Sequence, residues 1–576
     1  MVHCSGSTAK MLQILVQVVR GRYFMLYAST LILSTTGAGY IFGIYSGVIK
    51  SSMAYNQQTL NTLSFCKDLG SNIGILSGVI HEISPPSIVL AIGAAMNLSG
   101  YLMIWLAVAG HIAHPAVWQM CLYMFIAANS QSFAGVGALV TCVKNFPEDR
   151  GVVLGLLKGV VGLSGAIFTQ LYLAFYGQDP KSLILLIAWL PVAVSMLFLP
   201  TIRIIKAVRR TDDIKIFYSF LYITVALAGY LMFIIIFENR FKAPEFRGSA
   251  AIIIFMLFLP LVIAIREDLK SQSPKNNPPL AVLSVETQEP SAIAIAPPPL
   301  STPSSRKQSC FSSIINMLKD PERGEDYNIL QAITSIDMLI IFFLIICGPG
   351  GNLTAIDNMG QIGESLGYTN RGISTFVSLI SIWNFAGRVA TGIASEIFLS
   401  RYKFPRPLMM TIILLISCVG HLLIAFPCPG SLYVASVIIG FCLGAQWSLM
   451  FVIISELFGL KYYATLFSVA GAVTPIGSYV LNVRVAGRLY DREALKQRAV
   501  GSATTGDFTC LGKQCYKLSF IIIAAVTFLG SMVSVVLAVR TWKFYKGDIY
   551  ARFRSETTAT AESEMSVAGN ERDGEK

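Results

Sequence analysis

Long apolar segments recur along the whole chain, and each is close to the roughly 20 residues that an α-helix needs to cross a hydrocarbon core about 30 Å thick. Six such segments lie in the first part of the chain, two in the middle and six in the last part. Their approximate limits are 23–48, 61–82, 87–109, 117–143, 151–176, 182–203, 215–237, 249–266, 332–357, 372–396, 407–426, 431–455, 462–484 and 517–540. This pattern predicts an all-α integral membrane protein in which two six-helix halves flank two extra central helices.

The polar segments between these spans predict how the chain is organised. Residues 267–331 are rich in Pro, Ser and charged side chains, a composition that cannot bury enough apolar surface to fold. The expected order is a cytoplasmic N-terminus at 1–22, the N-terminal half at 23–203, an extra helix pair at 204–266, a flexible cytoplasmic loop at 267–331, the C-terminal half at 332–540 and a disordered cytoplasmic tail at 541–576.

Composition supports the membrane prediction. Apolar residues make up 54% of the chain and charged residues 13%, whereas a soluble domain usually carries about 25% charge. A chain with so few charges cannot cover a water-facing surface, but it can face lipid. The net charge is +12, and Lys and Arg lie beside apolar spans, as at 203–215 and 401–406. This placement indicates cytoplasmic loops near lipid headgroups, and we expect no nucleic-acid partner.

Basic residues in short loops also predict the orientation. They place the N-terminus in the cytoplasm, and an even number of spans returns the C-terminus to the same side. We therefore expect a multi-pass protein of the plasma membrane or the vacuolar membrane. One segment departs from the pattern: the loop expected outside at 485–516 contains several basic residues, including Arg488 and Arg492.

The two six-span halves share an internal repeat at an offset of about 313 residues. Gly47 corresponds to Gly360, and the segment 78–82 corresponds to 392–396, each beginning with Gly and ending with Glu. Two equivalent halves around a central site are typical of carriers that work by alternating access. A secondary transporter is therefore the leading hypothesis.

The repeated Gly-x-x-x-Glu element is similar to the signature of the major facilitator superfamily, Gly-x-x-x-Asp followed by basic residues. In this sequence Glu replaces Asp in both copies, and the first copy lacks the basic residues. The resemblance implies gating roles for Gly78, Glu82, Gly392, Glu396 and Arg401. Helix packing is the alternative role for the two glutamates.

A second resemblance covers roughly residues 20–540 and is more specific. The motifs that carry it are Gly21–Tyr23, Lys67–Gly70, Asn145–Pro147, Arg150–Gly151, Gly155–Gly159, Gly162–Gly165, Ala486–Asp491 and Cys510–Cys515. They resemble the plant nodulin-like major facilitator proteins, including the nuclear-fusion-defective group, and are more distantly similar to oxalate/formate and monocarboxylate carriers. The resemblance implies a multi-pass plant membrane protein, and it does not identify a substrate.

Two cations inside spans are candidates for binding a substrate. A charge at the bilayer centre costs at least ~2.5–3.5 kcal/mol, so such residues usually face a cavity. Lys158 would bind an anionic solute, or its long side chain would reach the cytoplasmic interface. The planar fork of Arg388 suits a carboxylate, and related anion carriers place an Arg in the equivalent helix. The alternative for Arg388 is a structural pair with Glu396, two turns later.

Glycine and proline interrupt the first span of each half at matching places. The residues concerned are Gly37, Gly39, Pro349, Gly350 and Gly351. Broken helices free backbone groups that can bind a substrate, although simple kinks fit the pattern equally well. Tyr40, Tyr45 and Asn352 would line the same region as further substrate-binding residues.

Two carboxylates are candidates for coupling transport to protons, because burial can keep an acid neutral near physiological pH. Asp68 follows Lys67 near the outer end of the second span, and Asp337 lies in the first turns of the span after the long loop. The alternative for both is a hydrated carboxylate at the membrane boundary, or one that pairs with a neighbouring Lys.

Other chemistry is scarce in this sequence. It contains no phosphate-binding loop, and its five His are scattered, so we expect no cofactor, no metal site and no enzyme activity. Cys510 and Cys515 could form a disulfide on an oxidising side of the membrane or remain free thiols. The leading hypothesis is a monomeric, proton-coupled carrier of a small organic solute, with a carboxylate as the first candidate. A carrier-like sensor or scaffold without transport is the alternative.

Overall fold

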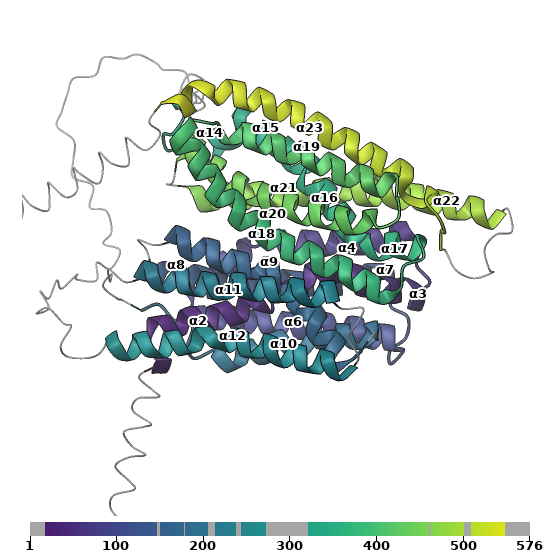
Figure 1. Cartoon of the computed structure of the whole chain (residues 1–576), viewed down its shortest axis with the longest axis horizontal. Coiled ribbons are helices and arrows are strands. Elements are labelled where there is room, and N and C mark those ends of the chain that lie inside the picture. The colour runs from purple at the N-terminus through teal and green to yellow at the C-terminus, as the bar shows by residue number, and fades with distance from the viewer. Residues whose placement is uncertain are drawn as a thin grey trace, which may run out of the picture.

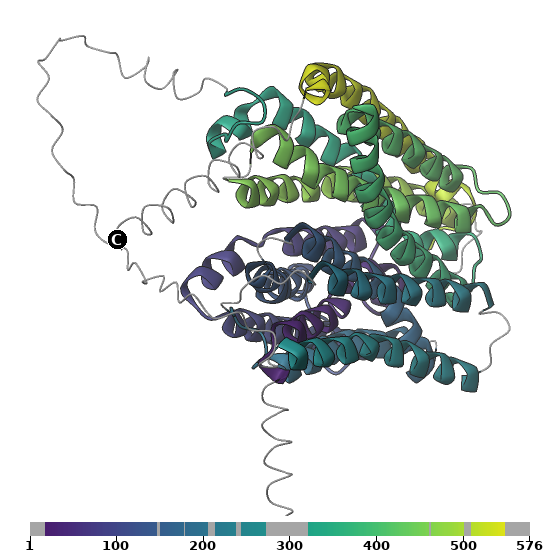
Figure 2. The same ribbon diagram turned by 60° about the vertical axis from the view of Figure 1, so that its left-hand side comes forward.

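The computed structural model describes residues 18–146, 150–177, 179–205, 213–237, 243–271, 321–459, 462–499 and 509–547. These residues form helices and connecting turns, without a strand, so the prediction of an all-α protein is confirmed. Figure 1 and Figure 2 show two helical bundles lying side by side, the first purple to teal and the second green to yellow. Most of the predicted flexible loop, at 272–320, and the predicted tail from 548 lie outside the described residues.

The first bundle contains six spans, several of them built from more than one helical piece. Its elements are α2 (Arg22–Ser34), η1 (Ala38–Ile41), α3 (Phe42–Ser52), α4 (Gln57–Asn72), α5 (Ile75–Ile83), α6 (Pro86–Ala109), α7 (Val117–Ala134), η2 (Gly135–Val140), α8 (Thr141–Asn145), α9 (Arg150–Phe175) and α10 (Pro180–Phe198).

The extra helix pair packs against the first bundle. It consists of α11 (Asp213–Phe237) and α12 (Ala243–Ser271), and α12 lies along α2 and α9. The Asp268 carboxylate on α12 accepts hydrogen bonds from the backbone N–H groups of Tyr23 (3.3 Å) and Phe24 (2.8 Å). These are free donors in the first turn of α2, so Asp268 serves as a cap supplied by another helix.

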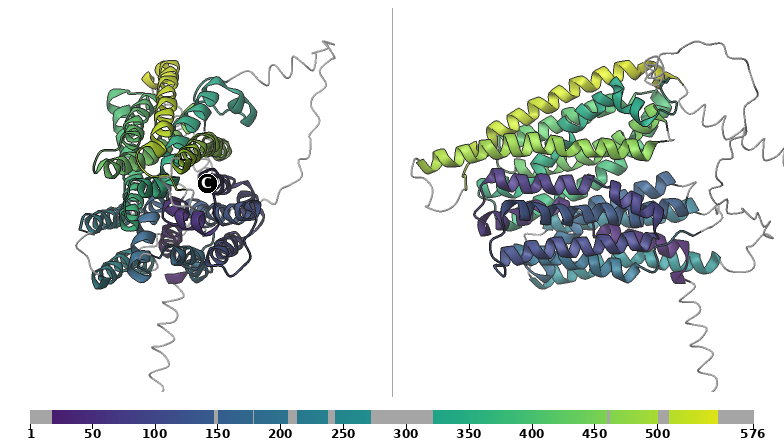
Figure 3. Two further views of the ribbon diagram at one scale, coloured as in Figure 1. Left: turned by 90° about the vertical axis from the view of Figure 1, so that its right-hand side faces the viewer. Right: turned by 180° about the vertical axis from the view of Figure 1, so that it is seen from behind.

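The second bundle repeats the six-span plan. Its elements are α14 (Ile329–Thr334), α15 (Ile336–Cys347), α16 (Pro349–Asp357), α17 (Met359–Ser365), α18 (Asn370–Tyr402), α19 (Arg406–Ala425), α20 (Ser431–Phe458), α21 (Tyr463–Gly477), η5 (Ser478–Gly487), α22 (Arg488–Ala499) and α23 (Gln514–Lys546). In the end-on view of Figure 3, the two bundles stay separate around a shared interface.

Thirteen helices in the described residues are long and apolar enough to cross a membrane. The one predicted span that is left over, 61–82, corresponds to α4 and α5. It does not meet the same criterion because the helix is interrupted at Ile73–Gly74 and because α4 carries many polar side chains. Those polar side chains form the central site described below.

Helix interruptions occur where glycine and proline predicted them in both halves. The first span of the first half breaks between α2 and η1, just before Gly37, and the first span of the second half breaks between α15 and α16 at Gly348. Pro349 begins α16, a position where its missing N–H costs no hydrogen bond. Farther along, the backbones of Gly43 and Gly360 touch across the two bundles, with no room for a side chain at Gly360.

One predicted boundary is wrong. The span expected to end at residue 484 continues through the π-helical segment η5 and α22 to Ala499, so the first part of the expected loop at 485–516 is helical. The reason is packing, because Tyr490 and Ala494 are buried against α23. In Figure 1, α22 projects beyond the rest of the second bundle.

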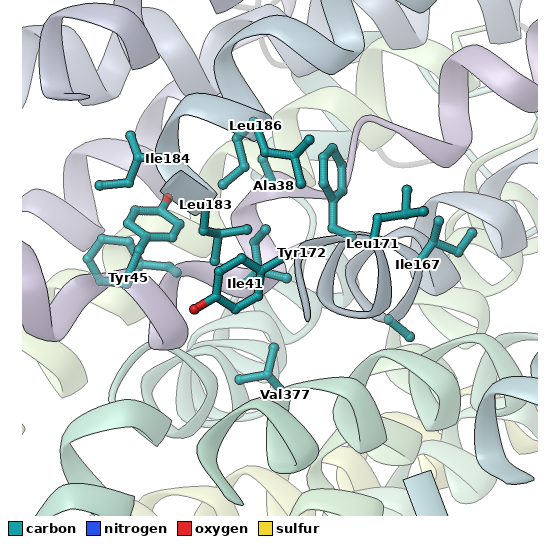
Figure 4. Packing of buried hydrophobic residues seen from close by; sticks show 14 of the residues in the cluster. Ala38, Ile41, Tyr45, Ile167, Leu171, Tyr172, Leu183, Ile184, Leu186 and Val377 are labelled. Carbon is teal, nitrogen blue, oxygen red and sulfur yellow. The ribbon is translucent and has the colours of Figure 1, made fainter. Parts of the chain in front are cut away.

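The bundles meet through an apolar core that includes residues from both. Figure 4 shows Ile41 and Tyr172 of the first bundle nearest to Val377 of α18, in one cluster with Tyr45 and Leu183. On α9, Gly159 and Gly162 allow the ring and backbone of Phe385 on α18 to approach closely. Small residues of this kind let membrane helices pack closely.

We name the two ends of the molecule by the elements that lie there. The α3 end, at the right of Figure 1, carries α3, α17 and α22. The α8 end, at the left, carries α8 and α14.

Candidate functional site between the two bundles

A polar stripe on α4 faces the second bundle. Its members are Gln57, Asn61, Ser64 and Asp68, and each is at most 4% exposed. Spacings of four, three and four residues place them on one side of the helix. Each makes a side-chain hydrogen bond to the second bundle, so this stripe joins the halves from the α3 end toward the middle.

The centre of this stripe is an ion pair between the bundles. The Lys67 ammonium on α4 lies 2.5 Å from the Asp357 carboxylate at the end of α16, and 3.1 Å from its own neighbour Asp68. It also donates to the carbonyl oxygen of Gly39 (3.4 Å), which the break in the first span leaves available. All three charged side chains are at most 5% exposed.

The two carboxylates have further partners on opposite bundles. The Ser478 hydroxyl of η5 donates to Asp68 at 2.5 Å, and the Ser64 hydroxyl of α4 donates to Asp357. Two carboxylates against one ammonium give this cluster a net charge of −1 when all three are ionised. An uncompensated buried charge is costly, so the two carboxylates depend on the shared ammonium and on their hydroxyl donors.

Side-chain amides extend the site toward the α3 end. Asn482 lies in η5, and π-helical segments of this kind are frequent at functional sites. The side-chain oxygen of Asn482 accepts a hydrogen bond from the Asn358 amide (2.7 Å). Its backbone carbonyl oxygen accepts one from the Asn61 amide (3.0 Å). Gln57 donates to Asn358 at 3.0 Å, which completes a chain of amides across the interface.

Asp491 closes the α3 end from the second bundle. Its two carboxylate oxygens accept hydrogen bonds from the backbone N–H groups of Gln57 (2.7 Å) and Gln58 (2.9 Å), the first residues of α4. Beside it, the Lys50 ammonium donates to the Gln57 side chain (2.9 Å) and lies 4.4 Å from the centre of the Tyr490 ring. A residue of the second bundle thus caps helix α4 of the first bundle.

The predicted cations Lys158 and Arg388 lie near each other between the bundles and interact electrostatically. Arg388 donates to the Tyr40 hydroxyl of η1 (3.2 Å) and to Asn384 on its own helix (3.0 Å). Lys158 lies 5.9 Å from the centre of the Phe451 ring of α20. Three of the five predicted substrate-binding residues are therefore brought together.

The alternative pair between Arg388 and Glu396 is wrong. Glu396 pairs instead with Arg406 (2.6 Å), which also binds Glu456 (2.8 Å) and Ser395 (2.5 Å). This cluster joins α18, α19 and α20 inside the second bundle. Arg406 is 2% exposed and is the basic partner of the motif glutamate, a residue that sequence reasoning missed.

The other predicted gating residues contribute less to this geometry. Arg401 is exposed at the α8 end. Gly78 and Gly392 have open space around the position that a side chain would occupy. The side chain of Glu82 lies outside the described part of the structure.

The remaining predicted binding residues lie apart from the two cations. Tyr45 is fully buried in the apolar core and packs edge-on against Phe42. Asn352 is buried inside the second bundle, where it donates to Gln446 (3.0 Å) and accepts from Ser417 (2.7 Å).

The two predicted proton-coupling carboxylates differ in their surroundings. Asp68 is buried near the C-terminal end of α4, so its alternative placement as a hydrated boundary group is wrong, although its pairing with Lys67 is present. Asp337 lies at the α8 end between Arg323 (2.7 Å) and Arg540 (2.7 Å). Two arginine partners favour a structural role for Asp337.

The structure joins Cys510 and Cys515 by a disulfide at the α3 end. The backbone N–H of Cys510 donates to the Tyr490 hydroxyl (2.9 Å), so this loop supports the aromatic ring that covers Lys50.

Solved transporters share this arrangement of two bundles. The POT family transporter PepTSo aligns with a TM-score of 0.54 and 8% identity over 91% of this chain and 98% of that chain. The inward-open xylose transporter XylE from E. coli aligns with a TM-score of 0.51 and 11% identity over 89% and 95%. The predicted major-facilitator-like fold is confirmed, and it defines the class of protein.

Family models and relatives then identify the family. The Nodulin-like model matches residues 22–265, and the model of the NFD4 C-terminal domain matches 325–547. Protein NUCLEAR FUSION DEFECTIVE 4 of Arabidopsis thaliana is 23% identical over 538 residues, covering 91% of this chain and 89% of the relative. The probable transporter MCH1 of Yarrowia lipolytica is 27% identical over 32% of this chain and 38% of its own length. The chain therefore carries a Nodulin-like domain followed by an NFD4 C-terminal domain. The relative MCH1 and the structural neighbours are named as transporters.

Proposed function

We propose that this protein is a secondary transporter that moves a small organic anion, a carboxylate in the first instance, by alternating access. The observation that carries this proposal is the pair of cations Lys158 and Arg388, held between the bundles with Tyr40. Among the described residues neither cation forms an ion pair with a carboxylate, so their charge is available to a ligand.

The chemistry of this cluster fits a carboxylate. The Arg388 fork can bind both oxygens of such a group, while Lys158 adds a second positive charge. Tyr40 comes from the broken first span and Arg388 from α18, so a ligand here would contact both bundles. A ligand that contacts both bundles can link its own binding to their movement.

The inter-bundle contacts support one conformational state. Asp491, Lys50 and the α4 stripe join the two bundles at the α3 end. Basic residues in short loops favour the α8 end, with both termini, as the cytoplasmic side. On this orientation the structure is closed to the outside, and one chain holds both halves, so a monomer suffices for transport.

Uptake into vesicles tests the proposal. The purified chain is reconstituted and offered labelled lactate, oxalate and succinate, with and without a pH gradient. We expect uptake of at least one of these anions, lost in Arg388→Ala and Lys158→Ala and partly retained in Arg388→Lys. Lys181→Ala removes an exposed cation at the start of α10 and serves as the matched control. Normal uptake in both Arg388→Ala and Lys158→Ala contradicts the anion site. No uptake of any of the three anions contradicts the carboxylate proposal.

A further inference from the structure

The charges of the Lys67 cluster, which consists of Lys67, Asp68 and Asp357, lie on both bundles. The two bundles must separate here if they rock against each other. Lys67 and Asp68 belong to α4 of the first bundle, whereas Asp357 belongs to α16 of the second. Separation at the α3 end breaks the contacts of Lys67 and Ser64 with Asp357 and the contact of Ser478 with Asp68. The bond between Lys67 and Asp68 survives, because both residues lie on one helix.

The two bodies are then left with different charges. The first bundle keeps a neutral pair, Lys67 with Asp68. The second keeps Asp357, whose cation has gone and whose neighbour on its own bundle, Asn358, is neutral. A carboxylate that loses its cation in a poorly hydrated interior is neutralised by taking up a proton.

We propose that Asp357 is the proton-binding site of the transport cycle, and that the α3 end opens when a proton on Asp357 releases Lys67 to Asp68. This inference rests on the proposed alternating-access function and adds the coupling ion and its site. The proton comes from the solution at the open side and replaces Lys67 as the partner of the Asp357 carboxylate, so no other reactant is needed.

The surroundings of Asp357 leave few rival groups for this proton. From α4 it faces Lys67, Asp68 and Ser64, and Cys66 is the next ionisable group along that helix. From α3 it interacts with Tyr45, which in turn contacts Tyr101 of α6. From η5 the cluster receives only the neutral Ser478 and Asn482. Asp68 is the one other carboxylate in this set, and it retains its ammonium partner on opening.

The cluster is connected to the anion site through two consecutive residues. Lys67 binds the carbonyl oxygen of Gly39, and Arg388 binds the hydroxyl of Tyr40. Both residues belong to η1, the short piece that the broken first span creates. When Lys67 is released, its contact with Gly39 changes, and this change reaches Tyr40, the next residue, which contacts Arg388.

The test measures opening of the α3 end as pH changes, without any substrate. Spin labels are placed on p-acetylphenylalanine at Ser51 of α3 and Asn370 of α18, both exposed at that end. The full chain is studied in lipid nanodiscs between about pH 8 and about pH 5. In the unmodified chain we expect the population with the longer distance to grow as pH falls, by at most about tenfold per pH unit for one proton.

Three variants decide the assignment. Asp357→Asn mimics the protonated acid, so we expect the longer distance to dominate at every pH. Asp68→Asn removes the carboxylate that pairs with Lys67 after its release from Asp357. We expect less opening of the α3 end at every pH, with the pH dependence of the opening unchanged. Asp337→Asn is the matched control, a buried and paired carboxylate at the other end, and should behave like the unmodified chain.

The outcomes separate this inference from the proposed function. Opening that still depends on pH in Asp357→Asn, or opening that never depends on pH in the unmodified chain, overturns the proton site even if anion uptake is found. Opening that depends on pH through Asp357, in a protein that moves no carboxylate, supports the proton site and contradicts only the proposed substrate. Asp357→Glu keeps the acid, so restored pH dependence in this variant shows that Asp357→Asn did not simply misfold.

Discussion

Two clusters of charge, each around a buried cation, are built alike but placed differently. Each sets one buried cation between two carboxylates, Lys67 with Asp68 and Asp357 in one, and Arg406 with Glu396 and Glu456 in the other. The Arg406 cluster lies inside the second bundle, where its partners keep their relative positions. The Lys67 cluster lies between the bundles. The same chemistry therefore holds one bundle together in one place, and on the proposed mechanism it joins the two bundles reversibly in the other.

The largest effect is expected at the cluster that holds one body together. Arg406→Leu would leave Glu456, itself largely buried, without its cation. Removing one partner of a buried ion pair costs ~3–5 kcal/mol, so we expect a large fall in thermal stability and poor recovery of folded protein. Fluorescence-detected size exclusion after heating measures this loss. Arg401→Leu, at an exposed position on the neighbouring helix end, is the control.

A smaller loss of stability is expected at the cluster between the bundles. Lys67→Ala would leave two carboxylates facing each other, but protons can neutralise them, so we expect a cost of about 1–3 kcal/mol. Transport should be abolished all the same, because the ion pair between the bundles that proton binding releases is then missing from the cycle. The double variant with Asp357→Asn removes the unopposed acid and should recover much of the lost stability in a double-mutant cycle. Stability losses that simply add would contradict the pairing.

The smallest effect is expected at the cap of α4. Asp491→Ala removes the carboxylate that binds two backbone N–H groups of the first bundle, a kind of cap worth ~0.5–2 kcal/mol. Because the cap crosses the interface, we expect its loss to favour opening of the α3 end with little change in melting temperature. Distance measurement between Ser51 and Asn370 reports the opening. Glu493→Gln, two residues along α22, changes a nearby charge that is not a cap and should leave the distance unchanged.

Sequence alone predicted most of the spans and the two cations near Tyr40, because long apolar segments and charges within them are local signals. It missed the Lys67–Asp357 pair, whose members are 290 residues apart and meet only when the bundles dock. One signal was available: the polar residues 57, 61, 64 and 68 recur at helical spacing in an otherwise apolar chain. Such a spacing predicts that one face of this span contacts polar groups of another part of the protein.

Two other misses have similar causes. Arg401 follows the motif glutamate in the sequence, but Arg406 binds it, because the turn before α19 brings the later residue back toward α18. The extension of α21 through η5 to Ala499 could not be seen from hydropathy, since α22 is polar on its outer face and packs with only a few buried residues such as Tyr490.

The central claim is that the bundles must separate at the Lys67 level in every transport cycle, and cross-linking tests it most directly. Ser64→Cys with Asn482→Cys joins the two bundles where these side chains lie 3.4 Å apart. Asn97→Cys with Ser130→Cys makes a comparable link, from 3.3 Å, inside the first bundle. We predict that oxidation stops uptake in the first variant, that reduction restores it, and that the second variant is unaffected. Undiminished uptake by a chain fully cross-linked between Ser64→Cys and Asn482→Cys would contradict the account.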